Sequence, residues 1–224
     1  MDRTEARLHI GMGGWDLPPF EKVFYPPTEK GFRKLRYYAE FFDSVELNAS
    51  FYNSAFSPGQ VERWIDDVSV NSRFVFTVKL FRGFTHSFNA TRSDYLSILR
   101  WLDQLRRAGR FGGLVVQFPA SFVNDHEQRE YVSRIVRAFA AYRVFIEVRH
   151  NSWHSPLMLN FFQESGAHVV NTDLPQIRRH MPFTAEAWGG VAYFRLMFST
   201  CVFTVDGAMN ILFAIWRKES PSTR

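Results

Sequence analysis

Charged side chains stand at the ends of several short apolar segments in this chain of 224 residues. The set combines carboxylates with cations and consists of Glu46, Glu147, Asp173, Lys79, Arg149 and Arg195. A charged residue beside an apolar segment is rarely buried unless it is paired or lies in a solvated cleft. Because clustered ionisable groups often mark functional sites, we predict that these residues form a site. The alternative is a layer of ion pairs with a purely structural role.

Three chemistries could use these charges. Lys79, Arg149 and Arg195 could hold a phosphate or carboxylate, since a guanidinium fork matches such anions. Glu46 or Glu147 would then act as general acid or base. A divalent cation held by carboxylates and a histidine is a second possibility, which the nearby cations weaken by competing for the same oxygens. A Schiff base on Lys79 is the third, although a lone lysine in a barrel is more often an ion-pair partner.

Histidine, amide and aromatic side chains are expected around these charges. His86 and His150 follow strand-like segments, where a histidine suits proton transfer near neutral pH. Aromatic rings in the same loops could stack on a ring-bearing ligand or only pack the loops. We assign catalytic roles to Glu46, Glu147, Lys79 and His86, and substrate binding to Asn48, Arg149, His150, Asp173, Arg195, Trp15, Tyr52 and Trp153. No resident cofactor or metal is predicted.

Alternating strand and helix patterns must position these residues. Apolar segments typical of buried strands lie at 8–11, 44–48, 73–79, 114–118, 144–149, 167–172 and 191–196. Helical spacing of apolar residues separates the first six of them. Such alternation predicts a parallel sheet, either a (β/α) barrel or an open doubly wound sheet. The sequence GMGGW after the first segment lacks the dinucleotide-binding glycine pattern, which weakens the open-sheet alternative. In both architectures the site forms at the C-terminal ends of the strands.

Composition limits the function without naming it. The formal net charge is +5 and the isoelectric point is near 9.5, which permits an anionic metabolite or a nucleic acid as partner. Arginines recur in two predicted helix regions, at 100–110 and 129–143. They could form solvated helix faces or a surface that binds phosphates. The single cysteine excludes an intrachain disulfide. The chain start lacks the apolar core of a signal peptide, and the apolar run at 211–216 is too short to span a bilayer, so we predict a cytoplasmic protein without a membrane partner.

A series of motifs resembles the YecE-like family, also described as domain of unknown function 72. The matching segments are GMGGW at 11–15, VFYPP at 23–27, VELNASFY at 45–52, FTVK at 76–79 with TH at 85–86, QFPASF at 117–122, FIEVRHNSW at 145–153 and YFRL at 193–196. The resemblance implies a TIM-barrel-like fold with these motifs gathered at the strand ends. It implies no reaction, because the family has no firmly established one.

The resemblance ends after Leu196. Family members usually read RLHG where this chain reads RLMF at 195–198, and they continue through another helix and a last strand. We therefore expect a single α/β barrel domain over 1–224 with seven recognisable strands, an atypical tail over 197–224, and the last β/α unit missing or replaced. A change of reading frame after this point is one hypothesis for the tail. A barrel that lacks one strand has two unpaired edges. The tail, for instance a strand over 198–205, or a partner chain could cover them.

The leading functional prediction is an enzyme that binds a small anionic metabolite at the strand ends and transforms it by acid–base chemistry. An isomerase, lyase or hydrolase type of reaction fits such a site. A nucleic-acid binding or processing protein is the second hypothesis, and a metabolite-binding protein without turnover is the third.

Overall fold

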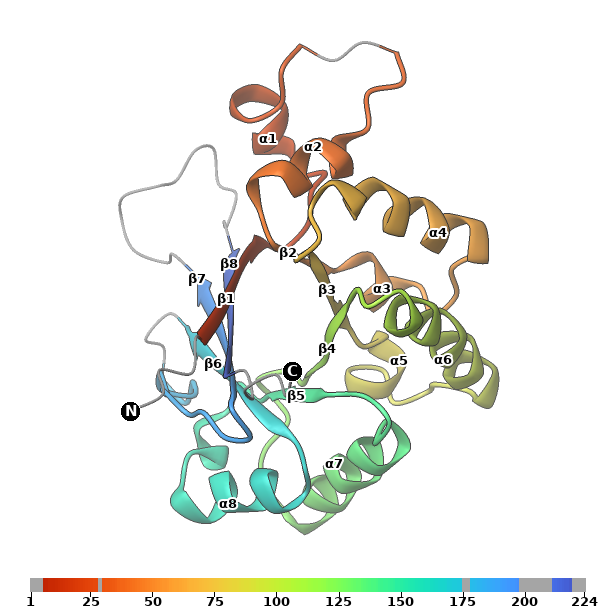
Figure 1. The fold of residues 1–224 in the computed structure, drawn as a ribbon. Coiled ribbons are helices and arrows are strands. Elements are labelled where there is room, and N and C mark those ends of the chain that lie inside the picture. The colour runs from red at the N-terminus through yellow and green to blue at the C-terminus, as the bar shows by residue number, and fades with distance from the viewer. Residues whose placement is uncertain (1–5, 28–29, 175–177, 198–210, 219–224) are drawn as a thin grey trace, which may run out of the picture.

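Eight strands close into a barrel in the computed structural model, which describes residues 6–27, 30–174, 178–197 and 211–218 (Figure 1). Neighbouring strands follow the order of the chain, and β1 to β7 run parallel. The strands are β1 (Ala6–Met12), β2 (Ser44–Leu47), β3 (Val75–Lys79), β4 (Phe111–Gln117), β5 (Val144–Glu147), β6 (His168–Asp173), β7 (Val191–Met197) and β8 (Ile211–Lys218). The seven predicted strands are therefore confirmed, and the architecture is the predicted α/β barrel.

The eighth strand closes the barrel in the opposite direction. β8 pairs antiparallel with β7, from Val191↔Arg217 to Met197↔Ile211. It also pairs antiparallel with β1, from Ala6↔Lys218 to Met12↔Leu212. A strand within the tail thus takes the place of the last β/α unit and covers both edges. The suggested strand over 198–205 lies outside the described residues.

Helices lie in the crossovers from β1 to β6 on the outside of the barrel, whereas the described residues between β6 and β7 form no helix (Figure 1). The longer ones are α2 (Lys34–Phe41), α4 (Pro58–Asp67), α6 (Arg92–Arg107), α7 (His126–Ala138) and α8 (Pro156–Glu164). Short helical turns lie in the connections: α1 (Pro18–Val23), α3 (Ala49–Tyr52), η1 (Val68–Val70), α5 (Arg82–Thr85) and η2 (Asn151–Trp153). Side chains cap several starts; Thr91 and Asp94 form a capping box at α6, and Asp125 caps α7.

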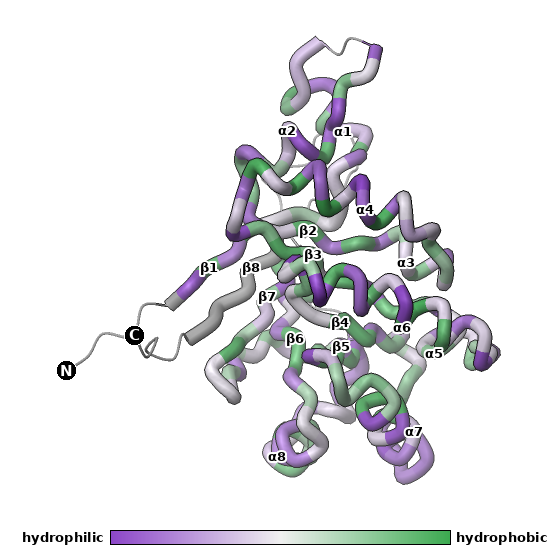
Figure 2. Tube along the Cα trace, turned by 45° about the vertical axis from the view of Figure 1, so that its right-hand side comes forward, coloured by the Kyte–Doolittle hydropathy of each residue, from purple (hydrophilic) through white to green (hydrophobic). Residues whose placement is uncertain are grey.

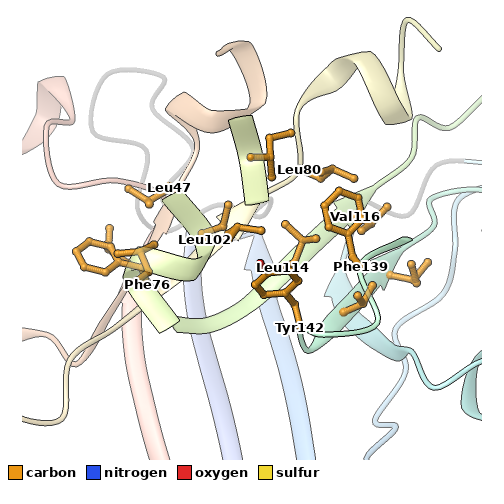
Figure 3. Packing of buried hydrophobic residues seen from close by; sticks show 14 of the residues in the cluster. Leu47, Phe76, Leu80, Leu102, Leu114, Val116, Phe139 and Tyr142 are labelled. Carbon is orange, nitrogen blue, oxygen red and sulfur yellow. The ribbon is translucent and has the colours of Figure 1, made fainter. Parts of the chain in front are cut away.

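Two apolar clusters occupy the two faces of the strands. The larger cluster lies between the outer strand face and the helices, and Figure 3 shows part of it, with Leu47 and Phe76 from strands near Leu102 from α6. The smaller cluster fills the barrel interior with Val115, Phe145, Val170, Val191 and Tyr193. Because successive side chains of a strand point to opposite faces, this assignment fixes which strand residues point inward. The inward positions continue from Val115 to Gln117, from Phe145 to Glu147 and from Tyr193 to Arg195.

Gly113 makes room for the interior packing. A Cβ atom at this position would overlap the ring of Phe145 on the neighbouring strand β5. That ring in turn packs against Tyr193, with 5.0 Å between the ring centroids. Aromatic rings thus fill the part of the barrel interior that lies before the C-terminal strand ends. Polar side chains occupy the strand ends themselves.

Candidate functional site

The guanidinium group of Arg195 joins three strands inside the C-terminal end of the barrel. Its Nη2 donates to Glu46 Oε2 on β2 at 2.5 Å, and its Nη1 donates to Gln117 Oε1 on β4 at 2.9 Å and also to Glu147 Oε2 on β5. The Tyr193 hydroxyl donates to the same Glu46 oxygen at 2.7 Å. All of these residues are buried. Of the six charged residues predicted to meet at the strand ends, Arg195, Glu46 and Glu147 contact one another here.

Glu147 is the most strongly fixed carboxylate of this Arg195 cluster. Its Oε2 contacts Arg195, and its Oε1 accepts a hydrogen bond from Arg149 Nε at 3.0 Å. Burial alone would raise the pKa of Glu147, but the positive charges of Arg195, Arg149 and Lys79 outweigh burial and lower the pKa. Glu147 therefore stays ionised and acts as a counterion inside the barrel.

Arg195 is held in its charged form by the same pairs. Burial opposes the charge, but the carboxylates of Glu147 and Glu46 outweigh it and raise the pKa of Arg195. Burial and the neighbouring Glu46 charge likewise raise the pKa of the Tyr193 hydroxyl, which remains protonated and can donate. The cluster is a set of mutually satisfied groups, in which Arg195 positions the two glutamates.

Lys79 and His86 lie beside this cluster and share the ring of Phe51. The Nζ atom of Lys79, at the end of β3, is 4.4 Å from the centroid of the Phe51 ring. The imidazole of His86 packs edge-on against the same ring at 4.8 Å, and its Nδ1 is 2.9 Å from Thr85 Oγ1. Phe51, from the short helix α3 after β2, thus brings two predicted catalytic residues to one place.

Burial and like charges lower the pKa of both groups. For Lys79 burial is the largest cause, with Arg195 and Arg149 acting in the same direction against Glu46 and Glu147. For His86 burial is again the largest cause, followed by the charges of Lys79 and Arg149. His86 is therefore neutral near pH 7 and can accept or relay a proton.

Two cations keep polar groups available at the mouth of the barrel. Arg149 uses its Nε toward Glu147, while its Nη atoms make no hydrogen bond with any described residue, and its side chain is 28% exposed. The Nζ of Lys79 makes neither a hydrogen bond nor a close ion pair in the described part of the chain. Both groups can therefore meet a ligand without first breaking a salt bridge.

A pocket of about 250 Å³ opens beside Glu46 at the ends of β1 and β2. Trp15, Glu46 and Asn48 line it together with the backbone of the loop that follows β1. Asn48 Nδ2 donates to the carbonyl of Gly13 at 2.6 Å, which ties this loop to the end of β2. Two carboxylates line this small pocket, Glu46 from β2 and Asp16 from the loop after β1.

The remaining predicted residues make other contacts than those of the Arg195 cluster. His150 Nδ1 accepts the backbone N–H of Ser152 at 3.1 Å, and Tyr52 is exposed beside Phe51. Asp173, at the end of β6, takes no part in the Arg195 cluster as far as the chain is described. Trp153 is fully buried, where its indole donates to the Phe122 carbonyl at 2.9 Å. The structure therefore places Trp153 in the core between barrel and helices.

Sequence reasoning missed two residues of the site. Tyr193 was absent from the predicted set although it lies two positions before Arg195, on the same strand face. Gln117, which ends β4, was likewise unassigned. The period of two along each strand is the signal that could have identified both.

Two absences hold for the described residues. No three His, Cys, Asp or Glu side chains among them come together in a way that could hold a metal ion. No helix in the same part of the chain is long and apolar enough to cross a membrane.

The fold and the site define a class of protein. It is an α/β barrel with a buried arginine–glutamate cluster at its strand ends. The chain belongs to the DUF72 family: the family model described as "Protein of unknown function DUF72" matches residues 9–206. The predicted resemblance is thereby confirmed.

Individual relatives agree with this assignment. The UPF0759 protein YunF of Bacillus subtilis is 28% identical over 181 residues, which is 76% of this chain and 62% of YunF. The chain thus spans less than two thirds of that relative. A crystal structure of a DUF72 family protein from Enterococcus faecalis matches with a TM-score of 0.61 and 26% identity, over 67% of this chain and 57% of that one. A DUF72 structure from Thermotoga maritima matches in fold, with a TM-score of 0.68 and 22% identity over 87% of this chain and 79% of the other.

Proposed function

We propose that the protein binds a small anionic metabolite at the C-terminal ends of its strands and transforms it by acid–base chemistry. The observation that carries this proposal is the pair of Arg149 Nη atoms, which are partly exposed and unbonded to any described residue. A guanidinium with both Nη groups available matches a carboxylate or phosphate in two parallel hydrogen bonds. Lys79, beside it, adds positive charge when protonated.

The charge balance of the mouth supports an anionic ligand. When Lys79 is protonated, it carries three positive charges together with Arg149 and Arg195, against the two negative charges of Glu46 and Glu147, which leaves an excess of one among these five side chains. The low-dielectric walls around these groups strengthen their attraction for an anion. An anionic ligand would neutralise this excess.

Glu46 and His86 are the groups proposed for proton transfer. Glu46 lines the pocket, and only its Oε2 takes part in the hydrogen bonds from Arg195 and Tyr193. His86 is neutral near pH 7 and lies beside the same mouth. The surroundings of Glu147 favour a permanent counterion role, so we place proton transfer on Glu46 and His86. A proton shift, an elimination or a hydrolysis could use this pair.

Thermal unfolding with anionic probes tests the anion site. Inorganic phosphate, 3-phosphoglycerate and malonate should raise the melting temperature of the protein, while neutral glycerol at equal concentration should not. Arg149→Met should weaken the fitted affinity by roughly tenfold to a hundredfold, because a charged hydrogen bond contributes about 1.5–3 kcal/mol.

The matched control is Arg100→Met, which removes an exposed arginine on the outer helix α6. This variant should respond to the probes as the wild type does. If Arg149→Met and the wild type respond equally, Arg149 does not hold the anion and the proposal fails.

A second candidate function, nucleic-acid binding, is favoured by a groove along α7. The groove has a volume of about 380 Å³, and Arg129, Arg134 and Arg137 line it with His126 and a single carboxylate, Glu130. Many residues of α7 are hydrophilic (Figure 2). Arginines along one helix are typical of a surface that binds phosphates.

The salt dependence of binding tests this candidate. Fluorescence anisotropy with labelled DNA and RNA oligonucleotides should show affinity that falls steeply as salt rises. Replacing Arg134 and Arg137 with alanine should reduce the slope by about one for each phosphate that the variant no longer binds, whereas Arg100→Ala should leave it unchanged. Absence of binding at low salt would remove nucleic acid as a partner.

A further inference from the structure

Lys79 differs from an ordinary barrel lysine because no carboxylate in the described part of the chain forms an ion pair with it. Glu46 and Glu147, whose charges act on Lys79, each form an ion pair with one nitrogen of Arg195 instead. Lys34 provides the contrast in the same protein, because its Nζ contacts Asp16 at 2.7 Å and also Glu21. Among the described residues, the interaction found for Lys79 Nζ is a cation–π contact, with the centroid of the Phe51 ring at 4.4 Å.

The position of Lys79 in the strand directs its side chain toward the barrel mouth. Lys79 ends β3 at the level of Val115 in β4, and it shares a strand face with Val75, which packs on the interior cluster. Two positive charges, Arg149 and Arg195, act on it from the segment after β5 and from β7, and both lower the pKa of its amine in addition to burial. Each unit of lowering raises the neutral, nucleophilic fraction near pH 7 about tenfold.

Groups that a lysine nucleophile requires lie around it. Arg149 can hold the anionic part of a substrate, and neutral His86 lies against the same Phe51 ring as Lys79. The hydrogen bond between His86 Nδ1 and Thr85 Oγ1 restrains the imidazole and leaves its Nε2 atom for proton transfer. Glu46, which lines the neighbouring pocket, is a base for a later step.

We infer that Lys79 forms a Schiff base with a small aldehyde or ketone that carries a carboxylate or a phosphate. The Nζ lone pair attacks the carbonyl carbon, a C–N bond forms, and the carbonyl π electrons move to oxygen. One proton passes from nitrogen to that oxygen, with His86 as relay. A second proton, taken from solvent through His86, protonates the resulting hydroxyl group. The C–O bond then breaks, water leaves, and the nitrogen lone pair forms the C=N bond of a protonated imine, so that no oxidant or reductant is consumed. The protonated imine withdraws electrons from the adjacent carbon, from which Glu46 can remove a proton.

Reductive trapping on the full chain tests the inference. The protein is incubated with pyruvate in one arm and dihydroxyacetone phosphate in another, sodium borohydride is added, and the intact mass is measured. Trapping should add one probe less one oxygen atom, and peptide mapping should place the adduct on Lys79. The two arms distinguish a carboxylate from a phosphate as the anionic part.

Two lysine variants serve as matched controls. Lys79→Arg keeps the charge and should abolish the adduct, while Lys34→Arg should leave it unchanged. Equal labelling of Lys34 and Lys79, or an unlabelled Lys79 in both arms, would overturn the inference. The labelling of Lys34 and Lys79 is compared within the wild-type protein, so this comparison does not depend on how well a variant folds.

The inference rests on the proposed anion site, and the two can fail separately. Stabilisation by phosphate or malonate without any adduct on Lys79 would leave the anion site in place and remove the Schiff base. An adduct on Lys79 that forms equally fast in Arg149→Met would support the nucleophile and remove Arg149 as the anion-binding group. In the expected case, Arg149→Met slows trapping of both anionic probes but not of neutral dihydroxyacetone.

Discussion

Glu46 and Glu147 contact the same arginine, yet their surroundings divide their chemistry. Glu147 has both oxygens bonded to guanidinium groups, whereas Glu46 keeps a place in the lining of the pocket. A buried carboxylate whose two oxygens are both paired with cations stays ionised and exchanges protons poorly. Arg195 thus contacts one glutamate that lines the pocket and another that balances charge inside the barrel.

Substituting Glu147 should destabilise the protein strongly. Glu147→Gln removes the partner of two guanidinium groups, and breaking a buried pair of this kind costs about 3–5 kcal/mol. Urea unfolding followed by circular dichroism measures the change in the free energy of unfolding. Glu62→Gln, an exposed position on α4, is the control and should change that free energy by less than about 0.5 kcal/mol.

The pH dependence of stability is a second measurement of the role of Glu147. Because the pKa of Glu147 is lower in the folded protein than in the unfolded chain, its contribution to stability is present above the ordinary glutamate pKa of about 4.3. That contribution is lost as the pH falls through the folded value. The wild type should lose this stability on acidification, and Glu147→Gln should lack this part of the profile. Equal profiles would contradict an ionised Glu147.

At the scale of elements, β8 decides whether the barrel is closed. Its backbone pairs with β7 on one side and β1 on the other, over the whole length of each. Unpaired strand edges expose N–H and C=O groups and promote association with other chains. The antiparallel direction lets a strand close the barrel without a crossover helix before it.

Removing β8 should therefore open the barrel. A chain ending at residue 210 is expected to lose its cooperative thermal transition and to associate at micromolar concentration, because β1 and β7 would both become edges. Calorimetry and size-exclusion chromatography measure the two effects. A control chain that ends at residue 218 retains β8 and should melt as the full chain does. A cooperative, monomeric melt without β8 would show that these edges tolerate exposure.

For the whole molecule, the sequence was most informative where apolar segments alternate with helical patterns. The parallel strands and the charges at their ends followed from that alternation, since parallel strands place their C-terminal ends at one face. The direction of β8 did not follow, because the pattern of 211–216 resembles any short apolar run. The burial of Trp153 and the place of Tyr193 in the site could not be predicted from the sequence either. Whether a ring after a strand is exposed depends on packing from distant segments, such as Phe122 against Trp153.

The pairing of Ala6 with Lys218 also determines where other molecules could be attached. These two positions face each other at the N-terminal end of β1, whereas Arg195, Glu46 and Glu147 lie toward the C-terminal ends of the parallel strands. Had the closing strand been parallel, its last residue would have stood at the mouth. A tag, a surface linkage or a fused domain joined at either end of the described barrel would begin at the face opposite the mouth, and access of small molecules to Lys79 and Arg149 would stay clear.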